Sequence, residues 1–157
     1  MYGQQLMMFN PRQSCLLPFD NNNSKKDMRK ITECGVILFN QDMYNLLIVF
    51  QHQSKKWGLP KGYMTRLELY NKEYFKCAKR ELLEETGIDL RIINYTKYGS
   101  VIIGNKLFFV IEIKRDYIES SPLDEYEIEQ IQWIKRKDLN LFVRSHNCNI
   151  TLNSLFN

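Results

Sequence analysis

Three glutamates close together constrain this chain more than any other feature. Glu81, Glu84 and Glu85 stand at spacings of i, i+3 and i+4, so an α-helix would carry all three carboxylates on one face. Like charges placed this way repel one another, whereas a hard divalent cation such as Mg²⁺ binds carboxylate oxygens and neutralises the cluster. The segment therefore predicts a metal-binding helix that runs from an N-cap at Asn71 to the residue before Gly87.

Short β-rich runs surround this helix. Strands are expected at Cys34–Phe39 and Leu46–Gln51, which form a hairpin, at Ile92–Tyr98, at Val101–Lys114 with a fold at Gly104-Asn105, and at Gln130–Ile134. A polar loop is expected at Asp116–Glu127, and one or two short helices after Lys137. Helices mixed with strands predict an α/β fold with helices packed on a mixed β-sheet. Residues 1–30 show no clear period and are expected to form a loosely ordered arm, so the domain spans 31–157.

Composition narrows the class of protein. A chain of 157 residues with 44% hydrophobic and 25% charged side chains suits one globular domain. The four cysteines lie far apart without a C-x-x-C pair, so no zinc site is expected, and reduced thiols agree with a cytoplasmic location. No run approaches the roughly 18 apolar residues that a membrane span needs. A net charge of +4 permits an anionic ligand without indicating nucleic acid.

The run from Gly62 to Ile88 resembles a Nudix box, whose pattern is G-x5-E-x7-R-E-U-x-E-E-x-G-U with U an aliphatic residue. The second half of the pattern matches without a departure. This resemblance implies a Nudix-type α/β/α sandwich with a mixed β-sheet, which cleaves a nucleoside diphosphate linked to another group with Mg²⁺ or Mn²⁺ as cofactor. The metal ligands that it implies are Glu81, Glu84 and Glu85, and the orienting residue is Arg80.

The first half of the box departs from the pattern. Arg80 follows Gly62 by 18 positions, four more than the pattern has. Counted forward from Gly62, the first box glutamate is Glu68. Counted back from Arg80, the same position is Lys72, and Glu73 lies next to it. The extra length is expected to enlarge the loop ahead of the helix, where it costs little, and the role of the first box glutamate stays open.

Two further segments are similar to the mRNA-decapping Nudix enzymes of eukaryotes and large DNA viruses. Residues 57–62 read W-G-L-P-K-G where that group has W-G-F-P-K-G, and residues 127–133 read E-I-E-Q-I-Q-W, which fits the E-I-x-x-I-x-W stretch of the same group. The catalytic residues implied are Glu85, Glu127 and Arg80, and the substrate-binding residues are Lys61, Gly62 and Trp57.

Three of these residues each allow a functional and a structural interpretation. In the resembling group Glu127 is a candidate general base or extra metal ligand, and otherwise it is a glutamate at a strand edge. Lys61 is suited to bind a phosphate as a point charge, or it is a solvated loop lysine. Trp57 either stacks on a base or packs against the sheet.

The resemblance implies hydrolysis of the mRNA 5′ cap with release of a methylated guanosine diphosphate, m7GDP. Hydrolysis of dinucleoside polyphosphates or diphosphoinositol polyphosphates is the alternative, because those enzymes share parts of the same features. A catalytically silent module that binds nucleotide or RNA is an alternative of another class, and it would be expected to lose box carboxylates. The expected partner is capped RNA or a small molecule linked to a nucleoside diphosphate; no membrane partner is expected, and no protein partner can be inferred.

Overall fold

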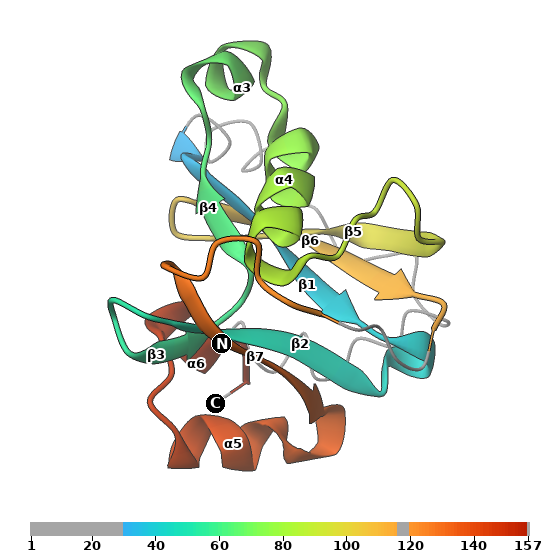
Figure 1. Ribbon diagram of the computed structural model, residues 1–157, viewed down its shortest axis with the longest axis vertical. Coiled ribbons are helices and arrows are strands. Elements are labelled where there is room, and N and C mark those ends of the chain that lie inside the picture. The colour runs from blue at the N-terminus through green and yellow to red at the C-terminus, as the bar shows by residue number, and fades with distance from the viewer. Residues whose placement is uncertain (1–29, 116–119, 157) are drawn as a thin grey trace.

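The computed structural model describes residues 30–115 and 120–156, which fold around one mixed β-sheet (Figure 1). Its strands are β1 (Glu33–Phe39), β2 (Asn45–Gln51), β3 (Lys56–Gly58), β4 (Lys61–Tyr63), β5 (Tyr95–Ile103), β6 (Lys106–Ile113) and β7 (Ile128–Lys135). The main path runs β3-β2-β1-β6-β5, while β4 pairs with β1 and β7 pairs with β2. The β1–β6 pair is parallel and the other described pairs are antiparallel, so the sheet is mixed as predicted.

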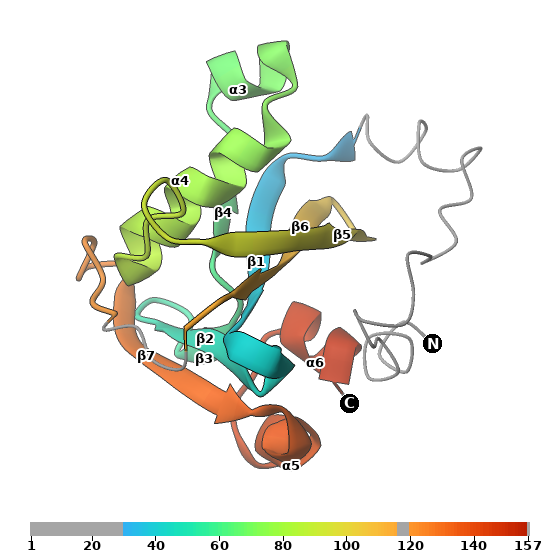
Figure 2. The ribbon, with the colours of Figure 1, turned by 90° about the vertical axis from the view of Figure 1, so that its right-hand side faces the viewer.

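Helices cover both faces of the sheet, which confirms the predicted α/β/α sandwich (Figure 2). The helices among the described residues are η2 (Gln41–Met43), α3 (Arg66–Asn71), α4 (Tyr74–Thr86), η3 (Arg136–Asp138), α5 (Leu139–Ser145) and α6 (Ile150–Phe156). On one face, α4 packs on the sheet through Cys77, Ala78 and Leu82. On the other face, α5 and α6 contribute Phe142 and Leu152 to a second core. The short helices expected after Lys137 are therefore present.

Strand β1 is the centre of the sandwich. All 7 of its residues are buried, because strands flank it on both sides and helices cover both faces. Side chains alternate along it: Val36 and Leu38 face the core under α4, whereas Ile37 and Phe39 face the core under α5 and α6. The predicted hairpin with β2 is confirmed by antiparallel pairing next to the turn.

The helix that carries the glutamates begins later than predicted. Asn71 is not its N-cap but the last residue of α3, and Lys72 after it has a left-handed backbone with φ of 54°. The sequence ahead of α4 therefore forms a separate helix, which starts with a capping box between Thr65 and Glu68. The predicted stop is confirmed, since Gly87 caps α4 with φ of 74°.

The later strands also differ from the prediction. Strand β5 begins at Tyr95 instead of Ile92, which is exposed in the preceding turn. It then continues to Ile103 without the predicted break, because a bulge between Lys97 and Gly99 absorbs the irregularity within one strand. The fold at Gly104-Asn105 is confirmed as the turn from β5 to β6.

Some predictions fall outside the described part of the chain. The N-terminal arm of residues 1–30 lies there except for Lys30, and so does part of the loop at 116–127. Among the described helices, none is long and apolar enough to cross a membrane.

Candidate active site

Helix α4, which carries the three glutamates, lies against β4 (Figure 1). Gly62 stands in the middle of β4, and a side chain at that position would overlap the carboxylate of Glu81. The carboxylate of Glu81 therefore occupies the space that a side chain at position 62 would need. Beside it, the backbone N–H of Lys61 donates a hydrogen bond of 3.0 Å to Glu85 Oε2. The predicted loop and the predicted helix thus meet at the carboxylates.

Glu85 is fully buried, with 0% of its surface exposed. One carboxylate oxygen accepts the hydrogen bond from Lys61, and the other, Oε1, has no hydrogen-bond partner among the described residues. Burial raises the pKa of Glu85 well above its ordinary value, and the nearby charge of Glu127 raises it further. Such a carboxylate is costly to keep in a protein interior unless something positive binds it.

Glu81 and Glu84 share a cation from their own helix. Arg80 Nη1 donates to Glu81 Oε1 at 2.6 Å and to Glu84 Oε2 at 3.2 Å. Glu81 is buried, and burial raises its pKa to about 6 although Arg80 pulls the other way. Glu84 differs from the other two because 48% of its side-chain surface is exposed.

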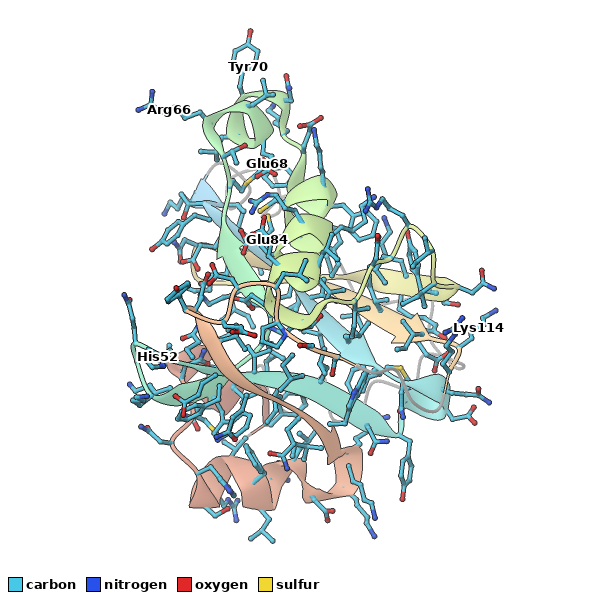
Figure 3. All side chains as sticks on the ribbon, viewed as in Figure 1. His52, Arg66, Glu68, Tyr70, Glu84 and Lys114 are labelled. Carbon is cyan, nitrogen blue, oxygen red and sulfur yellow. The ribbon has the colours of Figure 1, made fainter. Side chains whose placement is uncertain are left out.

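Arg80 is the centre of this hydrogen-bond network. Its Nε and Nη2 donate to the two oxygens of Glu68 at 2.9 and 3.0 Å, a bidentate contact, and Nη2 also donates to the Tyr63 carbonyl at 3.0 Å. The hydrogen bonds from Arg80 lower the pKa of Glu68 to about 2. In Figure 3, Glu68 lies between α3 and α4, with Glu84 farther along α4.

The bidentate contact answers the open question about the first box glutamate. Glu68, which keeps the spacing from Gly62, is the residue that pairs with Arg80. Lys72 instead forms the left-handed turn, and Glu73 pairs with Lys76 at 3.1 Å. The four extra residues therefore lie after Glu68, in the end of α3 and the turn into α4.

Lys61 is neither a solvated nor an unpaired lysine. Its Nζ donates to Glu33 Oε2 at 2.7 Å, and both side chains are largely buried. Lys106 approaches the other oxygen of Glu33 at 3.4 Å. Sequence reasoning missed Glu33. The signal that could have found it is its position as an acidic residue at the start of a β-rich run, where pairing of β1 with β4 places it near Lys61.

The loop that carries Glu127 is attached to the end of α4. Backbone N–H groups of Ser121 and Leu123 donate to the carbonyls of Thr86 and Glu84 at 3.0 and 2.9 Å. The loop therefore brings Glu127 towards the carboxylates. Partial burial raises the pKa of Glu127, as does the charge of Asp124, while Lys61 lowers it.

A cleft of about 400 Å³ opens between this loop, the β2–β3 turn and β4. Lys61 and Glu127, both predicted site residues, line it together. The other lining residues, which sequence reasoning missed, are Gln51, Gln53, Ser54, Tyr63, Asp124 and Tyr126. The volume suits a nucleotide-sized ligand.

Trp57 shows the packed alternative, and its predicted role in substrate binding is not supported. Only 8% of its surface is exposed. Its ring lies 5.1 Å from the ring of Phe50 and 5.7 Å from that of Phe142, measured between centroids. The indole is therefore part of the core under α5, since burial of an aromatic ring outweighs any stacking that an exposed position would allow.

The donor set fits a hard divalent cation. Glu85 has a buried oxygen without a partner, and burial raises the pKa of both Glu85 and Glu81, which a cation would reverse. Within the described residues, no three carboxylate, imidazole or thiol side chains are grouped closely enough to hold an ion. Arg80 instead binds Glu81 and Glu84, at 2.6 and 3.2 Å.

We expect the metal-free protein to lose stability as the pH rises from about 4.5 to beyond 6. The folded-state pKa of Glu81 is about 6 and that of Glu85 is raised, whereas both side chains titrate near 4.5 in the unfolded chain. Above 4.5 the unfolded chain therefore ionises first, and stability is lost until the folded pKa is passed. For Glu81 alone the loss is ~2 kcal/mol.

Melting temperatures at about pH 5 and about pH 8, with and without Mg²⁺, measure this effect. Mg²⁺ should stabilise the protein at the higher pH and have little effect at the lower one. A Glu81→Gln, Glu85→Gln double variant should show neither response. Equal stabilisation by Mg²⁺ at both pH values would contradict the expectation.

Fold and site together define a class of protein: an α/β/α sandwich whose glutamate-bearing helix meets a glycine in a short strand, with carboxylate donors of the kind that suit a hard cation. The family model of the Nudix domain matches residues 30–150. The chain therefore belongs to the Nudix hydrolase family, whose enzymes generally use divalent metals such as Mg²⁺ or Mn²⁺.

Individual relatives agree with this assignment. The protein named "Putative hydrolase 111R" of Invertebrate iridescent virus 3 is 29% identical over 123 residues, 76% of this chain and 65% of that protein. The mRNA-decapping enzyme subunit 2 of Arabidopsis thaliana is 27% identical over 108 residues, 66% of this chain and 28% of that protein. The chain thus matches less than two thirds of either relative. The structure of the Nudix hydrolase RenU of M. smegmatis is similar in fold, with a TM-score of 0.60, 14% identity and 81% coverage of each chain.

Proposed function

We propose that this chain is a metal-dependent hydrolase that cleaves a pyrophosphate linkage in the mRNA 5′ cap and releases m7GDP. The observation that carries the proposal is the cleft that Lys61 and Glu127 share, because the backbone of Lys61 also binds the buried Glu85. A nucleotide in this cleft would have its phosphates beside the carboxylates. The similarity to decapping enzyme subunit 2 supports the choice of cap over other pyrophosphates.

The carboxylates of α4 would hold Mg²⁺ or Mn²⁺. Glu85 has the buried oxygen without a partner, Glu81 lies next to it against β4, and Glu84 is exposed at the same end of the helix. When bound, the metal screens the phosphate charge and lowers the pKa of a bound water. Arg80 does not touch the substrate in this proposal. It is a positioning residue that holds Glu81 and Glu84.

Glu127 is the general base of the proposal. It lines the cleft, and its raised pKa lies closer to neutral pH than that of an ordinary glutamate, which favours acceptance of a proton from water. Lys61 would place its positive charge near the phosphates, while Glu33 holds its ammonium group in position. The proton taken from the attacking water would thus reside on the Glu127 carboxylate.

The deciding experiment incubates cap-labelled RNA with the protein and Mg²⁺ or Mn²⁺, alongside a diadenosine polyphosphate and an inositol pyrophosphate. We expect labelled m7GDP from the RNA, and affinity for the RNA that falls steeply as salt rises. Product from the small molecules alone would overturn the cap proposal in favour of the alternative hydrolases. No product from any of the three would favour the silent binding module. The proposed cytoplasmic location is tested separately by cell fractionation.

A further inference from the structure

The outer part of the cleft is lined by two tyrosines. Tyr63 extends from the end of β4 and Tyr126 from the loop before β7, and 72% and 91% of their surfaces are exposed. Large aromatic side chains usually gain stability by burial, so rings that remain exposed in a cleft with a catalytic carboxylate are suited to contact a ligand. Aromatic faces bind planar bases by stacking, which every base permits.

The charge at this part of the cleft is negative, although the chain as a whole carries +4. Asp124 and Glu127 both line it, and they lie close together, because the backbone N–H of Glu127 donates a hydrogen bond to Asp124 Oδ1 at 3.2 Å. The one lysine in the lining, Lys61, is paired with Glu33 at 2.7 Å. A positively charged group would therefore be favoured there over a neutral one of the same shape.

Amide groups complete the lining. Gln51 and Gln53 come from the end of β2 and the turn after it, and Ser54 donates a hydrogen bond of 3.0 Å to the side-chain oxygen of Gln51. Glutamine amides both donate and accept hydrogen bonds, as the edge of a purine does. The cleft therefore offers flat aromatic surface, negative charge and amide hydrogen bonds in one place.

We propose that this cleft binds the base of the substrate nucleotide on Tyr63 and Tyr126, and that Asp124 makes it prefer a positively charged, N7-alkylated purine to a neutral one. The inference rests on the proposed function for the position of the phosphates, which would lie at Lys61 and the carboxylates. The base then lies outward along the same cleft, on the side of the two tyrosines.

The test measures binding of m7GDP and of GDP by titration calorimetry in the presence of Mg²⁺. Tyr126→Ala should weaken m7GDP binding about tenfold or more, and Tyr126→Phe by less than about twofold because the ring is kept. Asp124→Asn removes the charge but keeps Oδ1, which accepts hydrogen bonds from the backbone N–H groups of Tyr126 and Glu127. This variant should reduce the preference for m7GDP over GDP and leave GDP binding almost unchanged.

Tyr70→Ala is the matched control. Tyr70 is 86% exposed but lies at the outer end of α3, away from the cleft lining (Figure 3). Its loss should leave binding as it is in the unmodified protein. If Tyr126→Ala and Tyr70→Ala behave alike while capped RNA is still cleaved, the base site is wrong and the proposed function stands. If m7GDP binding depends on Tyr126 but capped RNA is not cleaved, the base site stands and the proposed function is wrong. Equal affinity of the unmodified protein for m7GDP and GDP overturns the proposed selectivity.

Discussion

Replacing Glu85 by glutamine should lower kcat by on the order of 10³-fold and at the same time stabilise the metal-free protein at neutral pH. Activity falls because a neutral amide is a poor ligand for a hard cation, so the charge stabilisation supplied by the metal is lost. Stability rises because the substitution removes a charge that is fully buried and has one oxygen without a partner. Glutamine keeps the side-chain oxygen that accepts from Lys61.

Initial rates at saturating metal and chemical denaturation at about pH 8 measure the two effects. Glu73→Gln is the matched control, because it removes a carboxylate next to the start of the same helix. Among the described contacts, this carboxylate pairs with Lys76, three residues along the chain. We expect it to change neither quantity appreciably. A Glu85→Gln protein that is less stable than the unmodified one would show that the carboxylate is structural, and unchanged turnover would remove it from the site.

Replacing Arg80 by lysine should destabilise the protein by about 2–3 kcal/mol and also reduce activity. Lysine keeps the charge but lacks the planar group that contacts both oxygens of Glu68 and the Tyr63 carbonyl at once. Glu68, which is 4% exposed, would be left with part of its charge uncompensated. The estimate is below the value for a fully buried pair, because 29% of the Arg80 side chain is exposed.

Arg91→Lys provides a stringent comparison in urea denaturation. Arg91 also contacts an acid, Asp89, in a bidentate manner, at 2.9 and 2.7 Å, but 74% of its side chain is exposed. The same substitution there should change stability far less, because solvent screens an exposed ion pair. Equal losses of stability for the two variants would mean that the Arg80–Glu68 contact between α4 and α3 stabilises the protein no more than an exposed ion pair does. Since Arg80 positions Glu81, its variant should additionally require more Mg²⁺ for half-maximal activity.

Local patterns were enough for much of the fold. The strand at Cys34–Phe39 and the helix stop at Gly87 follow from short segments, and both are present as predicted. The prediction that α4 starts at Asn71 is wrong, and it arises because that residue has a good capping side chain. The competing capping box at Thr65 begins another helix, and the turn at Lys72 separates the two. A single-residue signal could not rank these alternatives, since each is favourable by about the same amount.

By itself, the sequence determined that three carboxylates share a helical face, because helix periodicity is a local property, and the resemblance to the Nudix box joined a glycine-bearing segment to them. Only the tertiary structure decided that Glu81 and Glu85 are buried while Glu84 is exposed. It also decided that Glu68 is the partner of Arg80, that Glu33 holds Lys61 and that Trp57 is packed. Those outcomes depend on contacts between residues distant in the chain and on desolvation. Neither can be read from spacing, since both arise only when the sheet brings the segments together.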